Sequence, residues 1–231
     1  CMSEFTFAFV DTLGIATEPP PGLTFTLDAP FSATAQGGYE QAEITVTGSR
    51  LALRELRRWL KYSVQILDPH GAVCWAGFVN EIALRFGGAN LTLSLERMFN
   101  AVKVLYSYSV PGGGNESGET AWLTDTESIN AYGRKELLHS AGGETSQSGA
   151  LALRANVLNA SKHITPTVQA QANGTDGATL YCRGKSATLD WRYYQDTGGI
   201  EANEEGGGRG LLGWGFTATN LGFVGQGHNR L

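Results

Sequence analysis

The chain has 231 residues, of which 42% are hydrophobic and 17% charged, and its formal net charge is −5. This composition is sufficient for a folded core and excludes a largely disordered chain. The negative net charge and the lack of a long basic cluster exclude a protein that grips nucleic acid by its phosphates.

The 31 glycines are scattered without a period, which predicts a β-rich protein with many turns. Cys1, Cys74 and Cys182 lie far apart, and no CxxC spacing occurs. Cys74 and Cys182 fall in apolar, strand-like segments, so we expect buried, reduced thiols there and no zinc site. No apolar run reaches the roughly 18–20 residues that span a bilayer, and no secretory signal is recognisable.

The residues at the two ends of the chain indicate where the natural protein begins and whether the sequence is a fragment. Cys1 precedes Met2, and we expect Met2 to be the natural start and Cys1 an added residue. The alternative is that Cys1 is the lipid-bearing first residue of a mature lipoprotein. At the other end, GFVGQGHNRL contains no closing element, which is typical of a fragment.

Residues 1–110 alternate apolar and polar side chains, as half-buried strands do. Ser49 precedes an amphipathic segment at 50–60 and is the expected N-cap of a short helix. Asp68-Pro69-His70-Gly71 is a strong turn sequence and predicts a hairpin, and a second hairpin is expected to turn at 87–90. The predicted strands are 4–10, 23–27, 42–48, 62–67, 72–84, 91–98 and 100–110. Together they predict a small antiparallel barrel or sandwich with one helix.

Residues 111–166 are predicted to be a linker and helical connector. A glycine-rich loop at 111–119 is followed by a short charged helix within 124–142. A longer amphipathic helix is expected at 149–164, with Ser146 or Ser148 as its cap and Pro166 beyond its end.

Strands are expected again at 167–172, 178–184 and 187–194. They predict a second β domain over 167–231, either complete or truncated. The fold class expected for the whole chain is therefore α+β: mainly β, with a few helices.

The sequence predicts no catalytic, cofactor-binding or metal site. The histidines lack metal-ligand spacing, GGGRG at 206–210 lacks the Lys-Ser/Thr of a phosphate loop, and no GxSxG elbow occurs. Glu201, Glu204 and Glu205 are more typical of a solvated loop than of the paired acids of a glycoside hydrolase. The tryptophans could line a sugar-binding face, but the alternation around Trp75 and Trp191 favours packing.

SVQILDPHGAVCWAGFVNEI is followed along the chain by the strand-like segment LTLSLERMFNAVKVLYS. The first segment resembles the hairpin V-x-I-x-D-x-x-G-x-x-x-W-x-G-x-V of minor tail and baseplate-hub proteins of tailed bacteriophages, and the second resembles the strand that follows this hairpin. An acidic/Ser–Ile–x–x–Tyr–Gly–Arg–x–Glu segment and an Ala/Leu-rich helix come next, so the resemblance covers roughly residues 40–195. The residues that carry the two motifs are Asp68, Gly71, Trp75, Gly77, Asp125, Ser128, Ile129, Tyr132, Gly133, Arg134 and Glu136.

The resemblance implies a structural virion protein related to the T4-like baseplate hub and late control protein D families. It implies tail-tube-like β-barrel domains that assemble as a trimer, join the tail tube to the host-contacting tip and line a channel for DNA. The partners implied are further copies of the chain, tail-tube or distal tail proteins and tail fibre or tip proteins, with DNA only in non-specific transit and no membrane. The protein would be made in the bacterial cytoplasm and reside in the phage tail, and the motif residues would have structural or interface roles.

Two other classes of function remain as alternatives. A carbohydrate-binding β module is suggested by the aromatic strands and glycine loops, with Trp191 and Trp214 as candidate residues. A cell-wall hydrolase is suggested only by Glu201, Glu204 and Glu205.

Overall fold

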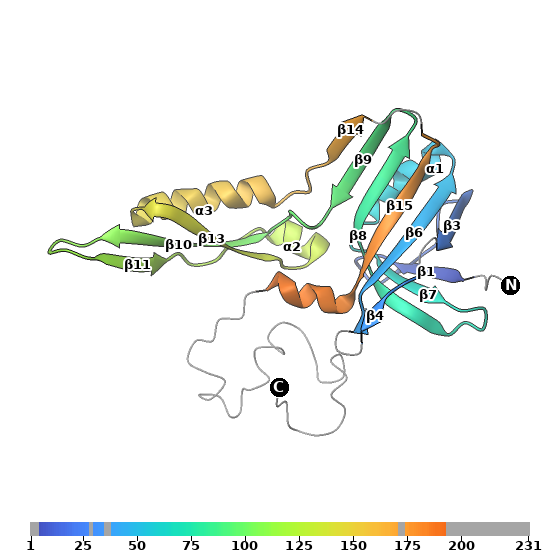
Figure 1. Cartoon of the computed structure of the whole chain (residues 1–231), viewed down its shortest axis with the longest axis horizontal. Helices are drawn as coiled ribbons and strands as arrows, with labels where there is room; N and C mark the ends of the chain where they lie inside the picture. The colour runs from blue at the N-terminus through green and yellow to red at the C-terminus, as the bar shows by residue number, and fades with distance from the viewer. Residues whose placement is uncertain (1–4, 28–29, 35–37, 171–173, 193–231) are drawn as a thin grey trace, which may run out of the picture. The chain divides into compact units, whose positions relative to one another are not determined.

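The computed structural model describes residues 5–27, 30–34, 38–170 and 174–192. Within these residues the protein is mainly β, with antiparallel sheets and a few helices, as the sequence predicts (Figure 1). None of the described helices is both long and apolar enough to cross a membrane.

The first sheet contains most of the strands. They are β1 (Thr6–Val10), β2 (Ala16–Thr17), β3 (Leu23–Leu27), β6 (Gln41–Gly48), β7 (Ser63–Leu67), β8 (Val73–Phe86), β9 (Ala89–Ser94), β14 (Thr167–Ala170) and β15 (Gly177–Gly184). The strand order is β2-β1-β7-β8-β15-β6-β3, and β8 also pairs with β9, which in turn pairs with β14. The long strand β8 therefore pairs with β7 along its first half and with β9 along its second half. A small separate hairpin is formed by β4 (Ala33–Thr34) and β5 (Gly38–Tyr39).

The first sheet curves so that its distant strands meet through aromatic side chains. The rings of Phe9 on β1 and Phe25 on β3 lie 5.2 Å apart, and Phe9 lies 4.6 Å from Trp59. Among the described strands β3 pairs only with β6 and not with β1 or β2, so backbone hydrogen bonds do not close the sheet. Of the prediction of an antiparallel barrel or sandwich, the antiparallel strands are confirmed and the closed barrel is corrected, because the first sheet is open and curved and its distant strands meet only through side chains.

Helix α1 (Arg50–Glu55) and the 3-10 turn η1 (Leu56–Arg58) follow β6 and confirm the predicted helix. Ser49 is the N-cap, because its side chain accepts a hydrogen bond from the backbone N–H of Ala52. Leu53 and Leu56 are fully buried in the core under the first sheet. Burial of each leucine stabilises the fold by about 1.5–3 kcal/mol.

A second, smaller sheet lies within residues 101–144. Its strands are β10 (Ala101–Ser109), β11 (Asn115–Glu119), β12 (Leu123–Thr124) and β13 (Glu136–Glu144). Strand β10 pairs antiparallel with β11 and β12 but parallel with β13. Helix α2 (Thr126–Tyr132) lies in the crossover to β13, and helix α3 (Gln147–Ser161) packs on β10. Together they enclose a separate small core of Val102, Val104, Ala141, Ala150 and Leu158.

The second sheet corrects the predicted domain organisation. The predicted first domain, 1–110, includes β10, which belongs to the second sheet. The predicted connector, 111–166, contains strands as well as the confirmed helix α3, whose N-cap is Ser146. Short loops with glycine mimic linkers in sequence, although here they join paired strands.

The predicted second β domain is also corrected for its described residues. Strand β15 lies between β6 and β8 in the middle of the first sheet, and β14 extends the same sheet from β9. Ala178, Leu180 and Cys182 of β15 are buried in the first core, which explains the placement. Residues 185–191 form a 3-10 turn, η2 (Lys185–Trp191), where a strand was expected. Residues 193–231 of the predicted domain lie outside the described part of the chain.

Candidate functional site

The first motif segment forms the tight loop between β7 and β8. The Asp68 carboxylate accepts hydrogen bonds from the backbone N–H groups of His70 and Ala72, both at 2.8 Å. Gly71 has φ +82°, a left-handed conformation that glycine adopts without strain, and its N–H donates to the Asp68 carbonyl. Asp68 and Gly71 therefore shape the hairpin loop.

The same motif continues into the core along β8. Trp75 is fully buried and its ring lies near Tyr39. A Cβ atom at Gly77 would collide with the carbonyl of Arg183 on β15 and with the ring of Trp75. Glycine is required at position 77 because two strands and a large ring meet there.

The second motif segment surrounds Asn100, a residue that was not predicted. The Asn100 side chain is fully buried, and its Nδ2 donates to the Gly133 carbonyl at 2.8 Å and to Ser128 Oγ at 3.2 Å. Its Oδ1 accepts from the Lys135 backbone N–H at 2.7 Å. One amide thus ties the start of β10 to α2 and to the turn that leads from α2 into β13.

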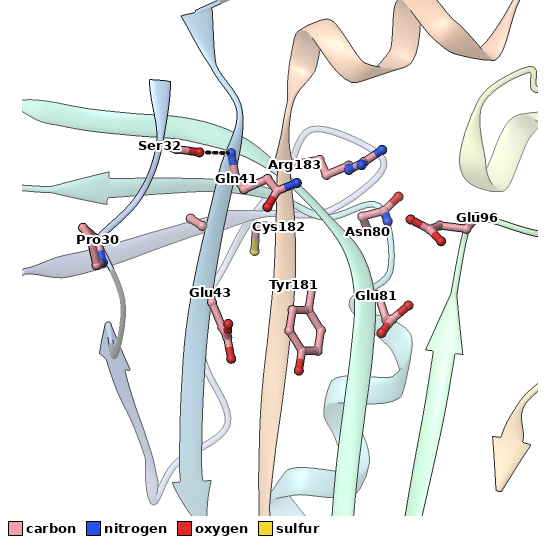
Figure 2. Close-up of a pocket in the computed structure, with 11 residues that line it drawn as sticks. Pro30, Ser32, Gln41, Glu43, Asn80, Glu81, Glu96, Tyr181, Cys182 and Arg183 are labelled. Carbon is pink, nitrogen blue, oxygen red and sulfur yellow. Dashed lines mark hydrogen bonds between the residues drawn. The ribbon is translucent and has the colours of Figure 1, made fainter. Parts of the chain in front are cut away.

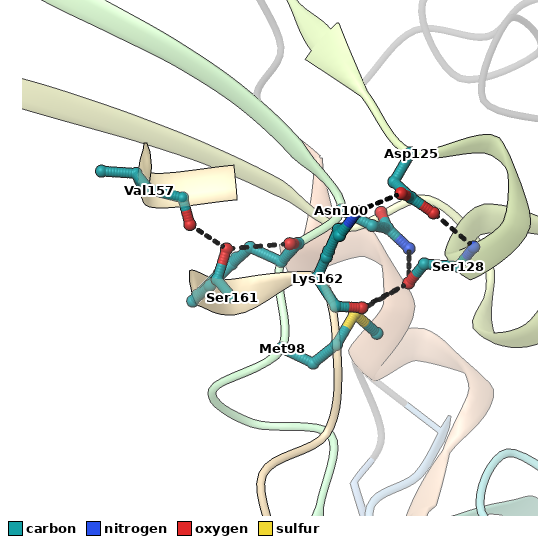
Figure 3. Close-up of polar contacts among 8 residues, drawn as sticks. Met98, Asn100, Asp125, Ser128, Val157, Ser161 and Lys162 are labelled. Carbon is teal, nitrogen blue, oxygen red and sulfur yellow. Dashed lines mark hydrogen bonds and ion pairs between the residues drawn. The ribbon is translucent and has the colours of Figure 1, made fainter. Parts of the chain in front are cut away.

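Ser128 and Asp125 join this network to the end of α3 (Figure 3). Asp125 caps α2 by accepting from the Ser128 N–H at 2.9 Å, and it pairs with Lys162 Nζ at 3.0 Å. The pKa of Asp125 is lowered, first by the Ser128 N–H and then by the Lys162 ammonium. Ser128 Oγ donates to the Lys162 carbonyl at 2.9 Å. Ser161, beside Lys162, donates to the Phe99 carbonyl.

The end of α2 packs toward the first core. Gly133 has φ +85° and closes the helix with a hydrogen bond from its N–H to the Ile129 carbonyl. Tyr132 is partly buried and packs against the core of the first sheet. Ile129 is likewise partly buried on α2. The combination of tyrosine and glycine therefore ends the helix and anchors it.

Buried charges follow directly after this turn. Lys135 Nζ donates to the carbonyls of Leu95 and Glu96 at 2.7 and 2.8 Å, and burial lowers its pKa to about 8. Arg134 pairs with the buried carboxylate of Glu136 at 2.7 Å. The structure thus brings the second motif together in one network where the chain passes between the sheets, while the first motif lies in the β7–β8 hairpin.

A polar hollow of about 600 Å³ opens on the outer face of the first sheet (Figure 2). Tyr181 of β15 pairs with Glu43 of β6 on one side and Glu81 of β8 on the other. Its side chain is 39% exposed, and burial together with the two glutamates raises its pKa. Asn80 and Glu96 lie at the edge of the same hollow. This exposed tyrosine between carboxylates was not predicted.

A β-bulge positions the side chains of β8 in this hollow. Tyr181 pairs with Glu81 and Cys182 pairs with Val79, which leaves Asn80 without a partner in the ladder. Val79 and Ile82 both point into the core, so Asn80 and Glu81 both face outward. The sequence signal was available, since two polar residues in succession interrupt the alternation of the strand.

A lysine at the start of β7 is held between aromatic rings. Lys61 Nζ lies 3.8 Å from the Phe78 ring centroid and 4.1 Å from that of Trp191. Lys61 also has φ +69°, which is uncommon for a residue other than glycine. Burial, with smaller contributions from Lys185 and Lys135, lowers the pKa of Lys61 to about 7.

The remaining candidate residues concern metal binding, thiol chemistry and sugar binding. Among the described residues no group of three or more His, Cys, Asp or Glu side chains is arranged to hold a metal ion. Cys182 is buried, as expected, whereas Cys74 is only partly buried; both are free thiols. Trp191 is buried in the core and does not offer a sugar-binding surface. Glu201, Glu204, Glu205, Trp214 and the GGGRG segment lie outside the described residues.

Comparison with known proteins did not add to this geometry. The chain matches no family model, and the comparisons with curated proteins and with solved structures found no match.

Proposed function

We propose that the protein is a structural component of a bacteriophage tail tip or baseplate hub, which acts by assembly and not by catalysis. The observation that carries the proposal is the ordered pair of sequence motifs at 63–82 and 125–136 that resembles tail and hub proteins. In this role the chain would join the tail tube to the host-contacting tip and line a channel for DNA.

The positions of the motif residues support this reading. Asp68, Gly71, Trp75 and Gly77 shape and pack the β7–β8 hairpin. The second motif, from Asp125 to Glu136, is held to Asn100 by buried hydrogen bonds, and Lys135 within it donates to the carbonyls of Leu95 and Glu96 just after β9. The motif residues therefore have packing and hydrogen-bonding roles, which is what we expect of motifs in a structural protein.

The strand edges offer a physical basis for assembly. Strands β2 and β3 end the described strand order and β14 ends the branch from β9, so each has one edge without a described partner strand. Unpaired edges can accept a strand from a neighbouring molecule, and in a ring of identical chains each contact repeats. We therefore propose a trimer held in part by strand pairing between copies.

The test combines purified phage particles with the isolated protein. Peptide mass spectrometry of particles is expected to find this chain, and electron microscopy with a labelled copy is expected to place it at the tail tip. Native mass spectrometry of the purified full chain is expected to show a trimer. A chain that is strictly monomeric and absent from particles would overturn the proposal.

A further inference from the structure

The outer face of the first sheet has features of a ligand site that the assembly role does not use. The Tyr181 ring lies along β15 between Glu43 and Glu81, and Figure 2 shows it presented on the surface of the sheet. Aromatic side chains on a solvated sheet face commonly provide a flat platform for a partner.

Asn80 supplies an independent indication of a ligand. The bulge turns this residue toward the hollow, and it is only 6% exposed. Its side-chain amide forms no hydrogen bond with any residue in the part of the chain that the structure describes. Neither amide atom is among the described polar atoms that are fully buried without a partner, so its donor and its acceptor are open to the hollow and available to a ligand.

The polar groups around Tyr181 indicate what could bind. Carboxylates of Glu43, Glu81 and Glu96 accept hydrogen bonds, while the Arg183 guanidinium donates them and Asn80 does both. Hydroxyl groups also both donate and accept, so a polyhydroxylated ligand can satisfy this mixture. The carboxylates disfavour an anion, and the guanidinium among them disfavours a small cation.

The size of the face favours a chain of sugar units over a single one. A second hollow of about 640 Å³ adjoins the first and shares Glu81 and Glu96 with it. Each volume is within the range of about 300–1,000 Å³ that is typical of small-ligand sites. The second hollow continues past Ser94 to His163 and Thr165.

We propose that this face binds a neutral oligosaccharide, with one sugar ring stacked on Tyr181 and hydroxyl groups held by Asn80 and Glu81. The C–H bonds on one side of a pyranose ring would lie against the phenol ring. The flanking carboxylates would then accept hydrogen bonds from hydroxyls at the rim of the same sugar. This site is independent of the tail assignment, because it requires only the described sheet.

Ligand-observed NMR on the full chain tests the proposal with maltotriose, cellotriose, the N-acetylglucosamine trimer and trigalacturonate. Saturation transfer is expected to at least one neutral trisaccharide and not to the anionic one. Tyr181→Ala is expected to weaken that binding by about tenfold or more, whereas Tyr181→Phe keeps the ring and most of the affinity. Tyr108→Ala removes a partly exposed tyrosine of the second sheet and should leave binding unchanged.

Glu81→Gln provides a second variant if Tyr181→Ala fails to fold, since it alters only an outward-facing group. It is expected to weaken binding of the same trisaccharide by about threefold or more. The proposal is overturned if no neutral trisaccharide binds at about 10 mM, or if Tyr181→Ala binds as well as the unmodified chain. It is also overturned if a lysine-rich peptide binds this face and the trisaccharides do not.

Discussion

At the scale of single residues, Asn100 holds α2 and the turn after it against the start of β10. Its buried amide reaches Gly133, Ser128 and the backbone N–H of Lys135, so both of its donors and its oxygen have partners. A fully satisfied buried amide stabilises one arrangement, and a partly satisfied one is costly.

Asn100→Asp is expected to lower the free energy of unfolding by about 3–5 kcal/mol, because an oxygen replaces the Nδ2 donor and a buried charge is left unpaired. Urea unfolding at neutral pH, followed by circular dichroism, measures the change. Asn130→Asp is the matched control, since Asn130 is exposed on α2. Equal stability of the two variants would contradict the role assigned to Asn100.

Lys61 gives stability a dependence on pH. Its pKa is about 7 in the folded chain, whereas an unfolded lysine has a pKa of about 10.4. Between these values the unfolded chain binds more protons, so the free energy of unfolding rises with pH. The ring contacts of Lys61 with Phe78 and Trp191 offset part of the cost of burial below pH 7.

Lys61→Met is therefore expected to reduce the gain in stability between about pH 6 and about pH 9. Lys135 contributes with the same sign, because its pKa is also lowered, so some of the gain should persist. Chemical unfolding at a series of pH values measures the slope, with the exposed Arg57→Met as control. An unchanged slope in Lys61→Met would show that burial of this amine is not the cause.

At the scale of elements, the β7–β8 hairpin depends on close approach to β15. Gly77 leaves room for the Arg183 carbonyl and the Trp75 ring, and no other residue fits without movement of a strand. The tight packing of protein interiors makes such movement expensive. The hairpin motif is thus explained by packing across the sheet as well as by its turn.

Gly77→Ala is expected to destabilise the chain by about 3 kcal/mol, the upper part of the usual range for overpacking. Gly142→Ala on β13 is the control, because a Cβ there meets nothing within 4 Å. The control should change stability by no more than about 0.5 kcal/mol. Thermal unfolding followed by near-ultraviolet circular dichroism distinguishes the two, and similar melting temperatures would refute the packing argument.

Elements with local signals were predictable from the sequence. Ser49 and Ser146 cap helices as expected, and the Asp68–Gly71 turn forms the predicted loop. These features depend on neighbours within a few positions, and the residue types record them directly.

Features made by distant contacts were not predictable in this way. The alternating pattern of 178–184 identifies a strand but cannot tell that its neighbours are β6 and β8. Residues 187–191 have strand-like side chains, yet Trp191 packs on Phe78 in a 3-10 turn. Asn100 carried no local mark, because its partners lie between 28 and 35 positions away.

At the scale of the whole molecule, assembly is the property that the proposed function requires. Strand β14 pairs with β9 alone among the described strands, and its Val168 is 67% exposed. An apolar side chain on an edge strand favours pairing with another chain, and a charge there opposes it. This edge is therefore the place to disturb the proposed trimer.

Val168→Lys is expected to shift the full chain from trimer toward monomer in native mass spectrometry, with little change in melting temperature. Leu13→Lys is the control, since Leu13 is 81% exposed and lies outside the strands. A trimer that is equally populated in both variants would exclude β14 as the assembly edge.

The central position of β15 has a consequence for synthesis. The strand that separates β6 from β8 is made after both of them, and Tyr181 must reach Glu43 across more than a hundred residues of chain. Until the ribosome has released residue 184, the nascent chain exposes the inner edges of β6 and β8. Late pairing of distant strands is slow and leaves edges open to aggregation. We therefore expect the first sheet to form only after residue 184 has emerged from the ribosome, with a dependence on chaperones that a sheet of successive hairpins would not have.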